Sequence, residues 1–250
     1  MAADGSADAG EQLKKLEHNA TLKSYHDLIR HERVQYENRR RESEFIFASP
    51  CEIAEALQDG PPATPNDLLA FVYDHLNILG RKLARTQTGR YQAYWNQDGH
   101  DLIQPKDEPI CSGLLAEDLQ NRINSQGLIV TVEHHMVSAK KCDLVVLQGT
   151  DRLLPIEVKH HFNSGLWTAW RDQLDKLYTR DAKAGGLGIY LVLWSGEAKK
   201  RMPKLPNRIE RPANAIELNK ALESLIPQKD RRRLRVVVVD ISPPDSLQTG

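Results

Sequence analysis

The sequence predicts an α/β domain with a central mixed β-sheet flanked by helices, preceded by a helical unit. From residue 108 onward, short apolar runs rich in β-branched residues alternate with amphipathic segments. Their order is α-β-β-β-α-β-α-β, which is typical of a mixed sheet covered by helices. Residues 11–85 instead carry helical patterns, and no apolar run reaches the roughly 18 residues of a membrane helix.

Composition agrees with a globular protein. The chain has 250 residues, 40% of them hydrophobic, with 34 Lys and Arg against 34 Asp and Glu. Its three cysteines, Cys51, Cys111 and Cys142, are widely spaced and form no CxxC pair. This spacing supports neither a zinc site nor a disulfide framework. We therefore expect reduced thiols and a cytoplasmic location.

The first third of the chain predicts helices. Residues 1–10 are small and polar, which indicates a disordered leader, and residues 11–47 contain no Gly or Pro. Thr64-Pro65 predicts a helix start, and the residues from 66 to 85 place a broad apolar stripe on one face. We expect a helical unit over residues 11–88, acting as an adaptor, a cover for the sheet, or a contact for a homodimer or larger assembly.

The α/β domain is expected over residues 89–250. Apolar periodicity and turn-forming residues predict helices over 108–124, 166–181 and 215–225, and strands over 128–132, 142–147, 153–160, 188–194 and 235–241. The second and third strands are separated by Gln148-Gly149-Thr150-Asp151-Arg152, a sequence typical of a turn. These two strands carry the charged residues that indicate function.

Folding that hairpin about Thr150 places Asp143 opposite Glu157. Because side chains alternate along a strand, Lys159 lies on the same face as Glu157. Two carboxylates this close on an apolar sheet would repel each other, and a divalent cation would relieve the repulsion. Hard oxygen ligands favour Mg²⁺ or Mn²⁺, and the ammonium could neutralise a phosphate oxygen or polarise water. The alternative is a solvated salt-bridge network, which the apolar neighbours on both faces disfavour.

Asp143, Glu157-Val158-Lys159 and Gln173-Leu-Asp-Lys-Leu-Tyr178 together resemble the PD-(D/E)XK nuclease superfamily, which has the restriction-endonuclease-like fold. The resemblance covers about residues 105–195. It implies that Asp143 and Glu157 bind the metal, that Lys159 is catalytic, and that Gln173 lies near the site or the nucleic-acid backbone. Two features depart from the family: no proline precedes Asp143, and Tyr178 follows Gln173 by five residues instead of the usual four.

The resemblance also implies a metal-binding glutamate on the preceding helix. Glu108 shares the side of Cys111 and Leu115, which is the expected core side, whereas Glu117 lies some 200° away from Leu115. We therefore expect Glu108 to join the site and Glu117 to be exposed. Gln173 lies on the expected buried side of its own helix, where a purely structural hydrogen-bond network is the alternative.

Basic residues cluster near the C-terminus. Residues 199–235 hold twelve Lys and Arg against four Asp and Glu, either as a solvated surface or as a contact for a polyanion. The candidates for phosphate contacts are Lys199, Lys200, Arg201, Arg231, Arg232 and Arg233. The sequence thus predicts a Mg²⁺-dependent nuclease acting on DNA, with RNA not excluded. By resemblance alone, its biological role would be either prokaryotic antiviral defence, against foreign DNA, or DNA repair. The alternative is a catalytically silent module that binds nucleic acid or protein.

Overall fold

A computed structural model describes residues 7–44, 60–84, 89–99, 101–136, 140–196, 200–206 and 209–243. The chain divides into two compact units, residues 1–60 and 61–250. Each unit is described by itself below. In the described part of the chain, no helix combines the length and the apolar character needed to cross a bilayer.

The first unit is a helical hairpin. Helices α1 (Ala7–Glu17) and α2 (His26–Glu44) are joined by the 3-10 helix η1 (Ala20–Tyr25) and pack against each other. The helical pattern of this segment therefore forms two helices, and α1 begins inside the segment expected to be a disordered leader. The buried hydrophobic residues described in this unit are Ala9, Leu13 and Tyr36.

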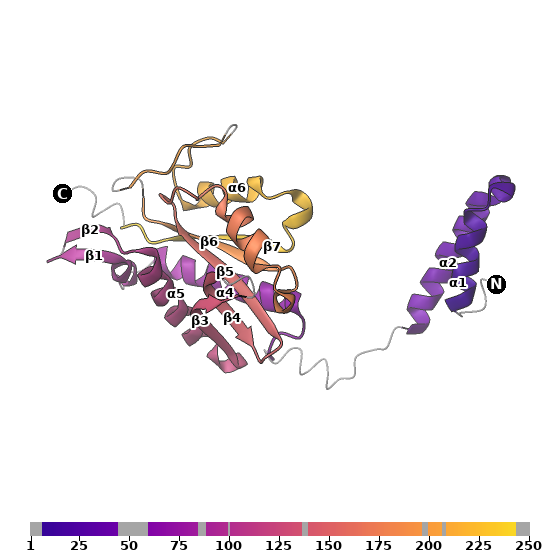
Figure 1. Ribbon diagram of the computed structural model, residues 1–250, viewed down its shortest axis with the longest axis horizontal. Coiled ribbons are helices and arrows are strands. Elements are labelled where there is room, and N and C mark those ends of the chain that lie inside the picture. Colours follow the sequence, from indigo (N-terminus) through magenta and orange to yellow (C-terminus); the bar gives the residue numbers. More distant parts are fainter. Residues whose placement is uncertain are drawn as a thin grey trace. The chain divides into compact units, whose positions relative to one another are not determined.

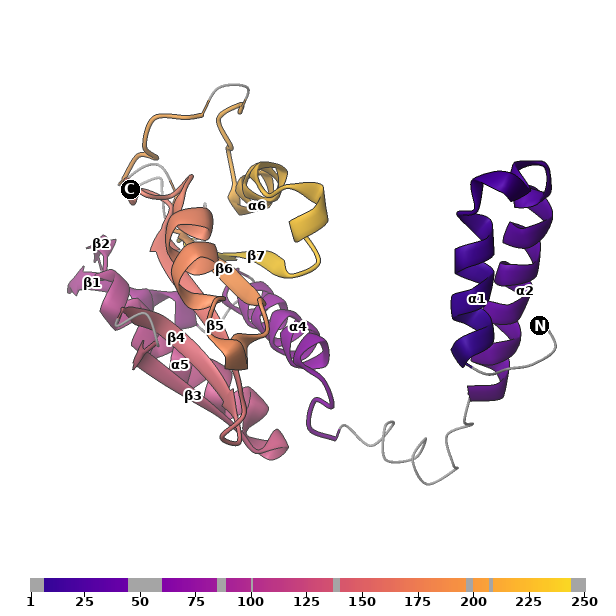
Figure 2. The ribbon, with the colours of Figure 1, turned by 45° about the vertical axis from the view of Figure 1, so that its right-hand side comes forward.

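The second unit is built on a five-stranded mixed sheet, as the sequence predicts (Figures 1 and 2). Strands β3 and β4 run antiparallel, as do β4 and β5, whereas β5, β6 and β7 are parallel. The spatial order follows the chain: β3 (Leu128–His135), β4 (Lys141–Gln148), β5 (Arg152–His160), β6 (Gly188–Trp194) and β7 (Leu234–Asp240). A separate antiparallel pair, β1 (Trp95–Asp98) and β2 (Asp101–Pro105), follows the 3-10 helix η2 (Arg90–Tyr94) and is not among the strands predicted from the sequence.

One face of the sheet is covered by α4 (Pro65–Ala84) and α5 (Glu108–Ile123). Helix α4 begins as its sequence predicts, because Thr64 and Asp67 cap each other: the Asp67 N–H donates to Thr64 Oγ1 and the Thr64 N–H donates to Asp67 Oδ2. Its buried residues, Val72 and Leu76 among them, belong to the same core cluster as Leu191 of β6.

This packing corrects the expected domain boundary. Helix α4 belongs to the α/β unit, so the helical unit ends near Gly60 and does not continue to residue 88. An apolar stripe shows that a helix is buried but does not reveal which surface buries it. The contact of α4 with β5, β6 and β7 decides the question here.

The opposite face is covered by η4 (Trp170–Tyr178) and α6 (Ala215–Leu225). The segment expected as one helix over 166–181 consists of turns followed by η4, which is a π-helix of nine residues. The Thr179 N–H donates to Leu174 O, five residues back, which is the π-helical pattern. Long π-helical stretches are rare, and π-bulges are often found at functional sites.

Candidate active site

The β4–β5 hairpin has the register that a fold about Thr150 predicts. Leu144 pairs with Ile156 and Val145 with Pro155. Continuing this register by one residue sets Asp143 opposite Glu157. Asp143 extends along the partner strand, where its Oδ2 accepts a 2.8 Å hydrogen bond from the Val158 N–H.

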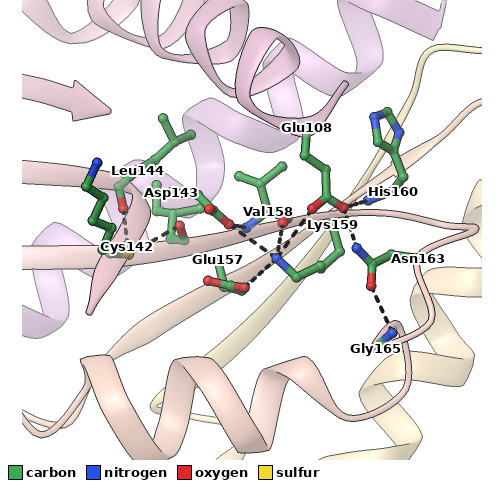
Figure 3. Close-up of polar contacts among 12 residues, drawn as sticks. Glu108, Cys142, Asp143, Leu144, Glu157, Val158, Lys159, His160, Asn163 and Gly165 are labelled. Atoms are coloured by element: carbon green, nitrogen blue, oxygen red, sulfur yellow. Dashed lines mark hydrogen bonds and ion pairs between the residues drawn. The ribbon is translucent and has the colours of Figure 1, made fainter. Parts of the chain in front are cut away.

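Lys159 lies at the centre of the charged cluster (Figure 3). Its Nζ is 2.6 Å from Glu157 Oε1 and 3.5 Å from Asp143 Oδ2. The same ammonium donates to the Val158 carbonyl at 2.9 Å. The structure therefore brings together the three residues that the sequence placed on one face.

Glu108 enters this cluster from the first residue of α5. Its Oε1 is 3.6 Å from Lys159 Nζ. Its Oε2 accepts hydrogen bonds from the His160 N–H at 2.9 Å and from Asn163 Nδ2 at 2.8 Å. Glu117 is exposed on another side of the same helix, as the helical period predicts.

Burial makes this cluster electrostatically unusual. Glu157 and Lys159 are only 1% and 8% exposed, whereas the side chains of Asp143 and Glu108 are partly exposed. Burial, reinforced by the nearby Asp143 carboxylate, raises the pKa of Glu157 to about 8. Burial opposes the charge of Lys159, but the three carboxylates outweigh it and raise the pKa of Lys159 above its usual value. A buried carboxyl group with such a raised pKa is typical of a functional site.

The donor set suits a hard divalent cation. Three carboxylates converge, and Glu157 Oε2 is buried without a hydrogen-bond partner among the described residues. As the side chains stand, however, no group of three or more His, Cys, Asp or Glu in the described ranges is arranged around a metal-sized position. The Lys159 ammonium lies between the carboxylates, within 3.6 Å of each. Residues 108, 143 and 157 could hold Mg²⁺ or Mn²⁺ if that ammonium moved aside.

Gln173 lies outside this network. It belongs to η4, which packs on β5 and β6, and its Oε1 is buried without a partner among the described residues. Tyr178, at the end of the same π-helix, donates from Oη to the Lys141 carbonyl at 2.7 Å. That bond ties the helix to the start of β4, just before Asp143.

The two basic segments lie at different ends of the sheet. Lys200 and Arg201 are exposed, and the Lys200 carbonyl accepts a 3.0 Å hydrogen bond from His161 Nε2, just past the end of β5. The Lys200 ammonium also lies 5.8 Å from the ring centroid of Phe162. Lys200 and Arg201 therefore lie near Lys159 in the folded chain. Lys199 lies outside the described residues.

Arg231, Arg232 and Arg233 instead precede β7, which begins opposite Gly188 at the start of β6. Lys159 pairs further along, with Val192. Arg231 and Arg232 are exposed. Arg233 already forms ion pairs inside the protein, at 2.6 Å to Asp175 and 2.8 Å to Asp230. Its guanidinium thus has a structural use that the sequence pattern did not reveal.

His160 and Asn163, whose N–H groups donate to Glu108 Oε2, were not predicted from the sequence as site residues. Both follow Lys159 closely in the chain, where the turn that ends β5 begins. A polar turn beside the strand that carries Glu157 and Lys159 was the available signal, but turn residues have no periodicity that assigns their direction.

Comparisons of the chain with protein-family profiles, with curated proteins and with solved structures found no match. The resemblance to PD-(D/E)XK nucleases therefore rests on Asp143, Glu157, Lys159 and Gln173, and on the sheet that carries the first three.

Proposed function

We propose that this protein is a metal-dependent nuclease that hydrolyses phosphodiester bonds in DNA. The observation that carries the proposal is the buried Glu157 carboxyl group, which lies beside Asp143 and Lys159 and has one oxygen without a hydrogen-bond partner in the part of the chain that the structure describes. Burying a carboxyl oxygen without a hydrogen-bond partner costs free energy, and a functional role would account for that cost. The partly exposed side chains of Asp143 and Glu108 leave the site open to a substrate.

The protein's own groups would divide the work. Glu108, Asp143 and Glu157 would hold Mg²⁺ or Mn²⁺, which supplies Lewis-acid activation of water and charge neutralisation at phosphorus. Lys159 would leave the carboxylates to neutralise a phosphate oxygen and orient the attacking water. The exposed Lys200 and Arg201 would contact the substrate backbone beside the site.

The test is cleavage of supercoiled plasmid with Mg²⁺ or Mn²⁺. Asp143→Asn and Glu108→Gln should abolish nicking, because each removes one charged metal ligand without changing side-chain size. Glu117→Gln, an exposed glutamate on the same helix, is the matched control and should cut like wild type. Single-stranded RNA assayed in parallel distinguishes the two nucleic acids. If neither plasmid DNA nor RNA is cleaved in the presence of the metal, the proposal is overturned.

A second candidate function is a catalytically silent module that binds nucleic acid or protein. One observation favours it: the Lys159 ammonium lies within 3.6 Å of all three carboxylates and partly neutralises them without a metal. Such a module would bind DNA in a gel-shift assay with unchanged affinity after Asp143→Asn and without metal. The nuclease would require the metal for cleavage.

We also propose that the helical unit associates with a second copy of itself. Over residues 9–39, the hairpin has a small core of Ala9, Leu13 and Tyr36. It exposes Leu28 and Tyr25, at 60% and 58%. Sedimentation of the full chain against residues 61–250 tests this. A monomeric full chain at micromolar concentration would rule it out.

A further inference from the structure

The two oxygens of the Glu108 carboxylate have different surroundings. Oε2 accepts two hydrogen bonds, from the His160 N–H and from Asn163 Nδ2. Oε1 faces the cluster, 3.6 Å from Lys159 Nζ. Because both donors hold the same oxygen, they fix the orientation of the carboxylate and leave the other oxygen directed at the site.

The Asn163 amide is itself fixed from the other side. Its Oδ1 accepts a 2.8 Å hydrogen bond from the Gly165 N–H, so the amide must present its NH₂ group to Glu108. Gly165 suits this close approach, since a Cβ there would lie 3.3 Å from Asn163 Oδ1. The turn that ends β5 thus holds the carboxylate that begins α5.

We propose that Asn163 is a positioning residue that orients Glu108 for binding of the divalent cation. The inference rests on the proposed nuclease function. Partners that fix a metal-binding carboxylate commonly contribute 10–100-fold to metal affinity, because the free ligand otherwise loses rotational freedom when the metal binds. The His160 N–H belongs to the backbone and cannot be removed by substitution, which makes Asn163 the partner that can be tested.

The experiment measures Mn²⁺ binding to the full chain by electron paramagnetic resonance, without substrate. Asn163→Ser keeps a hydroxyl that can accept from the Gly165 N–H but is too short to reach Glu108. Asn163→Ala removes both bonds. We expect both variants to bind Mn²⁺ on the order of 10-fold more weakly than wild type.

Asn219 on α6 provides a matched control. Its Oδ1 accepts from the Val238 N–H and its Nδ2 donates to Glu223 Oε1, both at 3.1 Å. This is the same pair of bonds, away from the charged cluster. Asn219→Ser should therefore bind Mn²⁺ like wild type while showing what loss of such a pair does to stability.

A positioning role also predicts that excess metal restores function. Cleavage by Asn163→Ser should reach wild-type rates at higher Mg²⁺, whereas cleavage by Lys159→Ala should not. Wild-type Mn²⁺ affinity in Asn163→Ser, with weakened binding in Glu108→Gln, would overturn the role of Asn163 alone. Absence of Mn²⁺ binding by the wild-type protein would overturn the proposed function as well.

Discussion

The two units of this protein are stabilised in different ways. The α/β unit buries apolar side chains on both faces of its sheet, including every residue of β6. Among its residues of described burial, the helical unit buries the hydrophobic residues Ala9, Leu13 and Tyr36, and its helices are joined by ion pairs from Glu17 to Arg30 and Arg33. A two-sided core can hold charged groups out of water, which a two-helix hairpin with a small core cannot. This contrast explains why the candidate chemistry lies in the α/β unit.

The largest expected effect is on the rate of DNA cleavage, which should depend on a lysine of the α/β unit and not on one of the helical unit. Lys159→Met should lower DNA cleavage on the order of 10³-fold, because it removes the ammonium that would neutralise the phosphate. Lys14→Met, which changes an exposed lysine of α1, should leave the rate unchanged. Initial nicking rates at saturating Mg²⁺ measure both. Equal losses would mean that the helical unit takes part in catalysis.

The next effect separates the units by stability. Leu191→Ala removes a fully buried side chain from β6 and should lower the free energy of unfolding by about 2–5 kcal/mol. Leu13→Ala should leave that transition unchanged and lower only the helicity of the first unit. Tryptophan fluorescence isolates the α/β unit, because all 4 tryptophans lie beyond residue 90. A urea midpoint that shifts equally in both variants would show that the units unfold together.

A smaller effect concerns acids that are paired with arginine. The hydrogen-bonded Arg233 lowers the pKa of Asp175 in the α/β unit. Because the folded-state pKa is lowered, the stabilisation is present above the unfolded pKa of about 3.9 and is lost as pH falls through the folded value. Asp175→Asn should therefore destabilise the protein at pH 7 by about 1 kcal/mol after solvent screening.

Urea unfolding from pH 7 to pH 3 measures this effect, and the gap between wild type and Asp175→Asn should narrow toward the acid end. The corresponding acid of the helical unit is Glu17, whose pKa is lowered by its hydrogen bonds with Arg30 and then Arg33. Glu17→Gln should reduce helicity without changing the fluorescence transition. A gap that stays constant with pH would mean that the Asp175 carboxylate does not contribute through its charge.

The smallest expected effect is that of removing the first unit. Residues 61–250 should unfold at the same urea midpoint as the full chain, because their core clusters contain no residue of residues 1–60. Their cleavage rate per site should also be unchanged. A lower midpoint or a slower rate would show that the helical unit supports the α/β unit.

Most of the sheet and all four charged residues of the cluster could be predicted from the sequence. Turn residues around Thr150 fix the hairpin register, the period of two then places Glu157 and Lys159 together, and the 3.6-residue period selects Glu108 over Glu117. The remaining features depend on contacts between distant segments. No local sequence pattern predicts the ion pair of Arg233 with Asp175 or the hydrogen bond from Asn163 to Glu108. The same reason explains the misplaced boundary at α4.

The π-helix η4 also has a consequence for how spacing in this segment is interpreted. Its backbone bonds join residues five apart, so positions 173 and 178 are related as positions four apart are in an α-helix. The interval of five residues between Gln173 and Tyr178 therefore spans about as many helical turns as four residues span in an α-helix. Residue counts and helical turns thus give different positions for Tyr178 relative to Gln173 in this segment.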